Sequence, residues 1–145
     1  MRSFSRTDLL ASETFLGDAP LRSRGRAVLV FPNTYTVGMS SLAVHTLYSL
    51  LNEGGLACER AFLPEVGASQ VSRSLETGTP LGGFDYVLVS SSYELDWLQL
   101  PAMLEAGGVP ALRAERGPNH PVVIAGGPAI TTNPRPLYDL VDAFV

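Results

Sequence analysis

Residues 26–55 constrain the fold of this 145-residue chain more than any other stretch. Residues 27–31 are a nearly continuous apolar run, typical of a strand buried on both faces, and Pro32 is expected to end it. A polar loop over residues 33–39 follows, and then a helical pattern that Gly54 and Gly55 close. A strand, a loop and a helix in this order open a βαβ unit, so ligands are expected to collect at the loop.

The rest of the chain repeats this unit. Further strands are predicted over residues 57–63, 86–89, 122–125 and 142–145, with helices over 93–106, interrupted at Pro101, and from Pro134 to residue 140. Residues 71–75 allow one weak helix. We therefore predict an α/β fold with a flavodoxin-like (Rossmann-type), doubly wound and mostly parallel sheet of about five strands in three α/β/α layers.

Two regions divide the chain. Residues 1–25 are predicted to be an extension with a short amphipathic helix, capped by Ser5 or Thr7, and a linker. Residues 26–145 are predicted to be the α/β domain, and because residue 145 falls inside an apolar strand, a further domain is expected to follow.

Helical periodicity also predicts which side chains face the core. In the helix after the first strand they are Leu42, Val44, His45, Leu47, Tyr48, Leu50 and Leu51. In the helix over residues 93–106 they are Leu95, Leu98, Met103 and Leu104. His45 is therefore interpreted as a partly buried structural residue, and no histidine is assigned to a metal or to catalysis.

Composition narrows the possible partners. The formal charge is −4 and all ten basic residues are dispersed arginines, which argues against nucleic-acid binding. Cys58 is the single cysteine, so the chain can form neither an internal disulfide nor a cysteine-rich metal or iron–sulfur site. No apolar run approaches the ~20 residues of a membrane span. We expect a cytoplasmic protein that binds no membrane.

Three loops are predicted to meet at the carboxyl edge of the sheet, over residues 33–39, 90–93 and 126–129. Their hydroxyl, amide and glycine groups suit the binding of a large polar cofactor rather than acid–base catalysis, and no catalytic residue is assigned. Gly126 and Gly127 either let a flat ligand approach the backbone or simply form a sharp turn. The serines either bind a ligand or cap a helix, and Tyr93 with Trp97 either lines a pocket, anchors another domain or packs in the core.

Three phrases of the sequence, FPNTYTVGMSSL, LETGTPLGGFDYVLVSSSYELDW and VVIAGGPAITTNPRPLYDLVDAFV, resemble an uncharacterised radical S-adenosylmethionine (radical SAM) family. The resemblance covers about residues 26–145 and is to the cobalamin-binding-like domain at the N-terminus of such proteins. It implies the same fold, cobalamin as the candidate cofactor, and the protein's own radical SAM barrel as the partner.

The cobalamin signature Asp-x-His-x-x-Gly is matched here by Asn33, Tyr35 and Gly38, so a bound corrinoid would have no histidine ligand to cobalt. The Ser-x-Leu signature is matched by Ser90 and Ser92, and the Gly-Gly signature is met in full. The resemblance and the loops together assign these cofactor-binding candidates: Asn33, Tyr35, Gly38, Met39, Ser90, Ser92, Tyr93, Gly126, Gly127 and Pro128.

The catalytic feature of the resembled family is a Cys-x-x-x-Cys-x-x-Cys loop that holds an iron–sulfur cluster and cleaves S-adenosylmethionine. This chain lacks the loop, so both groups would belong to the rest of the protein and the chain alone would be inactive. Three functions follow as hypotheses. The domain binds a corrinoid, packs on the barrel or does both, or it is a degenerate module that binds no cofactor and acts as a docking or substrate-presenting surface. The third hypothesis is a free-standing domain that binds a small molecule, if the chain is complete.

Overall fold

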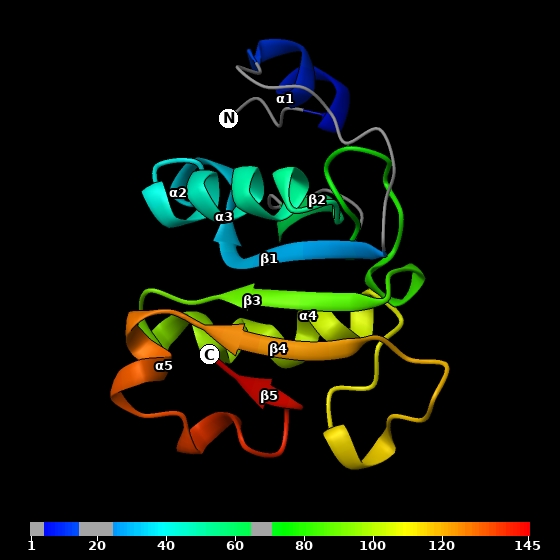
Figure 1. Ribbon diagram of the computed structural model, residues 1–145, viewed down its shortest axis with the longest axis vertical. Helices are drawn as coiled ribbons and strands as arrows, with labels where there is room; N and C mark the ends of the chain where they lie inside the picture. Colours follow the sequence, from blue (N-terminus) through cyan, green and yellow to red (C-terminus); the bar gives the residue numbers. More distant parts are fainter. Residues whose placement is uncertain (1–4, 15–24, 65–70) are drawn as a thin grey trace.

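The computed structural model describes residues 5–14, 25–64 and 71–145, which form a sheet of five parallel strands with helices on both faces (Figure 1). The strands are β1 (Arg26–Thr34), β2 (Ala57–Leu63), β3 (Tyr86–Ser90), β4 (Val122–Gly126) and β5 (Ala143–Phe144). The α-helices are α1 (Arg6–Ser12), α2 (Tyr35–Gly38), α3 (Leu42–Glu53), α4 (Leu100–Ala106) and α5 (Pro128–Thr132). Short 3-10 helices are η1 (Leu81–Gly83), η2 (Glu94–Gln99), η3 (Arg113–Glu115) and η4 (Arg135–Leu137).

The strand order is β2-β1-β3-β4-β5, which confirms the predicted flavodoxin-like fold. The first strand, β1, pairs with β2 on one side and with β3 on the other side. The order therefore reverses between β1 and β3, and the carboxyl ends of these strands form the crevice where ligands of such folds bind.

The apolar run of β1 serves two cores. Ala27, Leu29 and Phe31 pack in a cluster with Val44 of α3, whereas the alternate residues of the strand belong to a cluster on the opposite face. That second cluster includes residues of α4 and α5. The predicted strand, buried on both faces, is confirmed because side chains alternate along a strand and both sides of β1 are covered.

Pro32 does not end β1, contrary to the prediction. The strand continues to Thr34, and its register with β2 shifts between Phe31 and Thr34. Pairing with β3 ends at Val30, so the proline, which has no N–H, removes no hydrogen bond from that ladder. The expected loop over residues 33–39 is instead the end of β1 followed by the single turn of α2.

The inner face of α3 is narrower than predicted. Val44 is buried, and Tyr48 and Leu51 pack against the same cluster at i+4 and i+7. The wrong assignments are Leu42, His45, Leu47 and Leu50, all of which are exposed. The ring Nε2 of His45 lies 2.9 Å from the Met39 carbonyl oxygen. A helix at the edge of a sheet buries one stripe, and the outer leucines of α3 fall outside it.

The helix over residues 93–106 breaks as predicted, into η2 and then α4 with Pro101 in its first turn. Met103 and Leu104 are buried as expected, but Leu95 and Leu98 are 77% and 73% exposed. A 3-10 helix has three residues per turn, so Trp97 and Leu100 face the core in their place. The prediction failed there because it used the α-helical period.

Four further predictions concern the first helix, the linker after it, the crossover after β2 and the last helix. α1 is capped by Ser5, whose Oγ accepts the N–H of Asp8 at 3.2 Å, and Thr7 lies inside the helix. The helix expected from Pro134 is wrong, since α5 starts six residues earlier at Pro128 and residues 134–140 contain only η4. Residues 71–75 form no helix, whereas residues 18–24 of the predicted linker lie outside the described part of the chain.

The crossover after β2 covers the outer edge of that strand. The N–H of Leu75 donates to the Arg60 carbonyl at 2.6 Å, and the Arg60 N–H donates to Glu76 Oε2 at 2.7 Å. These bonds satisfy the free edge of β2, which would otherwise offer a template for another strand.

Within the described ranges, no helix is long and apolar enough to cross a membrane.

Candidate functional site

The three predicted loops do meet at the carboxyl edge of the sheet. Ser90 pairs with Gly126 in the ladder between β3 and β4, and the N–H of Ser91 donates to the Gly126 carbonyl at 3.0 Å. Asn33, at the end of β1, reaches η2, where its Nδ2 donates to Asp96 Oδ1 at 3.0 Å. The ends of β1, β3 and β4 are thereby linked through hydrogen bonds.

Asp96 is the polar residue of this edge that the sequence-based assignment missed. The residue is 5% exposed, and its Oδ2 atom is buried without a hydrogen-bond partner among the described residues. A buried carboxylate oxygen without a donor costs about 1–3 kcal/mol or more. The signal in the sequence was an acidic residue five positions after the buried Ser91, but an acidic residue there is equally expected in the first turn of a helix.

The serine cluster mainly anchors η2. Ser91 is fully buried, and its Oγ accepts the indole N–H of Trp97 at 2.9 Å while donating to the Tyr93 carbonyl at 3.2 Å. Ser90 is buried as well, whereas Ser92 is half-buried. Trp97 is thus a core residue, and Tyr93 is exposed on the surface of the edge.

The packing of the chain itself leaves no room for a side chain at Gly126 or Gly127. A Cβ on Gly126 would lie 2.7 Å from a methyl carbon of Val145. Gly127 has a φ of +117°, and a Cβ there would collide with the Ser91 carbonyl oxygen. Contacts within the chain are therefore enough to explain why both positions are glycine.

Tyr35, Gly38 and Met39 face the α1 side of the molecule. The Tyr35 hydroxyl donates to Glu13 Oε1 at 2.6 Å, and its ring packs edge-on against Phe62 with centroids 5.4 Å apart. Burial, and then the Glu13 carboxylate, raise the pKa of Tyr35 to about 12. A Cβ on Gly38 would collide with the Phe62 ring. This half of the predicted site is used for packing.

Met39 contacts a buried ion-pair network that Arg60 of β2 forms with Glu13 and Glu76. Its Sδ atom lies 3.3 Å from Nη1 of Arg60. The Arg60 guanidinium binds both oxygens of Glu13, at 3.1 and 2.6 Å, and its Nε donates to Glu76 Oε1 at 2.7 Å. Its carbon Cζ lies 4.7 Å from the centroid of the Tyr48 ring. Although burial lowers the pKa of Arg60, the two carboxylates outweigh burial and raise it.

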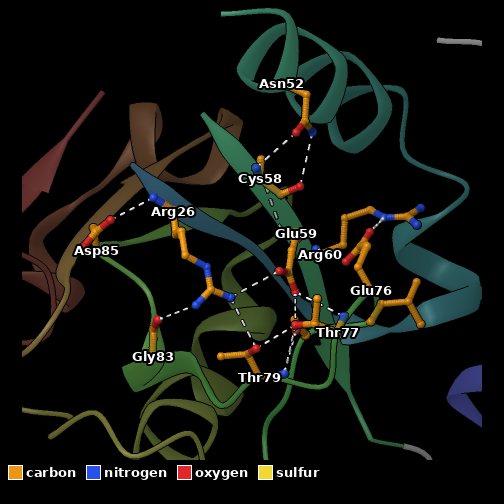
Figure 2. A network of polar contacts seen from close by, with 12 residues as sticks. Arg26, Asn52, Cys58, Glu59, Arg60, Glu76, Thr77, Thr79, Gly83 and Asp85 are labelled. Carbon is orange, nitrogen blue, oxygen red and sulfur yellow. Dashed lines mark hydrogen bonds and ion pairs between the residues drawn. The ribbon is translucent and has the colours of Figure 1, made fainter. Parts of the chain in front are cut away.

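A second polar network lies at the amino end of the sheet (Figure 2). Arg26 Nη2 is 3.4 Å from Glu59 Oε1, and Glu59 Oε2 accepts the Thr77 hydroxyl at 2.7 Å. The Arg26 N–H donates to Asp85 at 2.8 Å, which ties β1 to the segment before β3. Burial raises the pKa of Glu59, but hydrogen bonds from Ser74, Thr77 and Arg26 outweigh it and hold the pKa below its usual value. These contacts fasten the crossover to the sheet.

Cys58 is a core residue. It is buried, and Asn52 bridges its backbone, donating to the Cys58 carbonyl at 3.2 Å and accepting its N–H at 3.1 Å (Figure 2). Burial, and then the nearby Glu76 carboxylate, raise the pKa of the thiol to about 12, so the thiolate is scarce at neutral pH.

The carboxyl edge combines amide, hydroxyl and carboxylate groups with exposed apolar side chains. Within residues 5–14, 25–64 and 71–145, no group of three or more His, Cys, Asp or Glu side chains is placed to hold a metal ion. Asn33, Ser92, Tyr93 and Pro128 remain at least partly accessible. The edge is suited to binding and recognition.

A comparison with curated proteins found no match. The family described as "Radical SAM proteins, N-terminal" matches residues 43–145, which is well over half of the chain and includes the edge elements η2 and α5. The chain therefore belongs to the family of N-terminal regions of radical SAM proteins.

Proposed function

We propose that this chain is a non-catalytic docking domain whose carboxyl edge packs against the catalytic domain of a radical SAM protein. The observation that carries the proposal is the exposure of large apolar side chains at that edge. Tyr93, Leu95 and Leu98 project from η2 into solvent. Leu42 at the start of α3 and Val37 of α2 are exposed at the same edge. Apolar surface of this kind marks interaction sites.

The charge of the edge supports the same proposal. Residues 33–42, 90–99 and 126–133 include Glu94 and Asp96 but no arginine or lysine. Asp96 is buried, so the surface is apolar with one exposed acidic residue, Glu94, and the matching surface is apolar with a cationic or other hydrogen-bond donor opposite Glu94.

The chain holds a single cysteine, Cys58, so the iron–sulfur cluster and S-adenosylmethionine of a radical SAM protein would be held by the catalytic domain. In this proposal the chain contributes binding energy and position, and the catalytic domain contributes the chemistry.

Calorimetric titration of the chain with the separately produced catalytic domain tests this proposal. The double variant Leu95→Ser/Leu98→Ser should weaken binding by about tenfold or more, because two apolar side chains no longer leave water. Leu50→Ser is the matched control, since Leu50 is exposed on the outer side of α3, away from this edge, and its variant should bind as the unaltered chain does. Absence of binding, or equal losses in both variants, would refute docking at this edge.

Corrinoid binding is the second candidate. It is favoured by the reversal of strand order between β1 and β3, which leaves Asn33 at the crevice with Ser92, Tyr93 and Pro128 accessible nearby. The engaged Tyr35 does not contribute to such a site. Titration with hydroxocobalamin, followed by visible spectroscopy and calorimetry, decides between the candidates. A saturable change favours the corrinoid, and no change up to about 1 mM counts against it.

A further inference from the structure

Among the described residues, one half of a sheet face carries no helix. Tyr86 and Leu88 of β3 pair with Val122 and Ile124 of β4 on the face that α3 covers elsewhere. Tyr86 is 38% exposed and Val122 is 43% exposed, while Leu88 and Ile124 are half-buried. We call these four residues the open face. Their neighbours along the two strands, Val87, Val89, Val123 and Ala125, are buried against the opposite core.

Figure 1 shows the asymmetry: α3 lies in front of β2 and beside β1, α4 lies behind β3 and β4, and no described element covers the front of β3 and β4. Parallel sheets are normally covered on both faces, which is why their strands are apolar throughout. The open face is apolar and belongs to a parallel sheet, so we expect another element to pack on it.

The open face is as wide as one helix. Neighbouring strands are about 4.8 Å apart, so β3, β4 and the short β5 span about 10 Å, which matches the diameter of an α-helix. A second sheet cannot lie flat here, because α3 stands on the same face beside the open strip. These dimensions exclude sheet-on-sheet pairing of two copies.

We infer that the open face receives one amphipathic helix from the remaining polypeptide of the radical SAM protein, laid beside α3. The family assignment supplies the source, because this chain belongs to the N-terminal regions of radical SAM proteins. The helix presents aliphatic residues at i, i+3 and i+4 to Tyr86 and Val122, and polar residues to solvent. The inference does not depend on docking at the carboxyl edge, since the open face lies on the flat side of the sheet.

Thiol labelling tests the inference. The one native cysteine, Cys58, is buried and reacts slowly. Val122→Cys places a thiol on the open face, and Leu50→Cys places a control thiol on the exposed side of α3. Each variant is labelled with a maleimide both as this chain and within the complete radical SAM protein, and peptide mass spectrometry measures the rate at each site.

The expected result is rapid labelling of both thiols in this chain. In the complete protein, the Val122→Cys thiol should react about tenfold more slowly or slower still, with Leu50→Cys unchanged. Equal rates of Val122→Cys in the two proteins would overturn the inference. A rate in this chain that falls as its concentration rises would also overturn it, since a second copy would then be the cover.

Two additions keep the outcomes distinct. Tyr86→Cys probes the same face if Val122→Cys fails to fold, and must give the same protection. Leu95→Ser/Leu98→Ser introduced with Val122→Cys separates this inference from the proposed function. Loss of docking with continued protection of the thiol supports the helix alone, and loss of protection would assign the cover to the docked domain and overturn the inference.

Discussion

The sharpest prediction concerns the buried guanidinium of Arg60. Its side chain is 3% exposed and joins Glu13, which follows α1, to Glu76 of the crossover through distances of 2.6 to 3.1 Å. Arg60→Met keeps the aliphatic stem that packs near Tyr48 but leaves two carboxylates without their counter-charge. The matched control is Arg73→Met, because Arg73 is exposed and its Nη1 donates to a backbone carbonyl at 3.0 Å.

The magnitude follows from the burial of the network. Removing one partner of a buried ion pair costs about 3–5 kcal/mol, whereas a surface arginine contributes at most about 1 kcal/mol. For a chain of this size, the loss corresponds to a Tm lower by about 10–15 °C. The loss of stability in Arg60→Lys should lie between those of Arg60→Met and Arg73→Met, since an ammonium group keeps the charge but not the bidentate geometry.

Urea unfolding followed by the fluorescence of the single tryptophan, Trp97, measures these differences. The triple variant Glu13→Gln/Arg60→Met/Glu76→Gln removes all three charges and should recover part of the loss, because no unpaired charge is then buried. A loss below about 1 kcal/mol for Arg60→Met would contradict the reasoning, since it would mean that the network contributes no more than surface pairs do.

Three further predictions follow from the same contacts. Gly127→Ala should cost more than about 2 kcal/mol in urea unfolding, because its φ of +117° disfavours a side chain and the Ser91 carbonyl occupies the Cβ position; an unchanged midpoint would contradict this. Asp96→Asn should change the free energy of urea unfolding by less than about 1 kcal/mol, since Oδ2 has no partner among the described residues to lose, and a larger loss would contradict this. Burial raises the pKa of Glu13, but hydrogen bonds from Arg60 and Tyr35 outweigh it and hold the pKa below its usual value. The stability this provides is present above about pH 4.5 and is lost as pH falls through the lowered pKa, so Glu13→Gln should flatten the decline of the urea midpoint between about pH 5 and 3.

The strands were predictable because their signal is local. Residues 57–63 form β2 with the predicted bounds, and β3 and β4 differ from prediction by one residue each. Continuous apolar runs bounded by glycine and proline leave few alternatives, and the right-handed crossover rule limits the order in which parallel strands can join. Together they were sufficient for the flavodoxin-like order.

The candidate site was predictable only in part, because its contacts are distant in sequence. Topology alone brought Asn33, Ser90 and Gly126 to one edge, as expected. Nothing local indicated that Tyr35 would turn to Glu13, 22 positions earlier, or that the Ser91 backbone would close the space beside Gly127. Such pairings depend on how α1 and η2 pack on the finished sheet.

Exposed apolar side chains, rather than unpaired polar atoms, are what support docking at the carboxyl end of the sheet. Buried polar atoms without a partner among the described residues occur at both ends: Asp96 Oδ2 at the carboxyl end, and at the amino end Nε of Arg116, whose guanidinium binds Asp142 just before β5. At the amino end, Arg26, Glu59 and Asp85 bind one another or the crossover (Figure 2). At the carboxyl end, apolar side chains such as Leu98 project into water. Apolar side chains that stay in water contribute nothing to the folding of the chain, so a partner that covers them explains their place at this end.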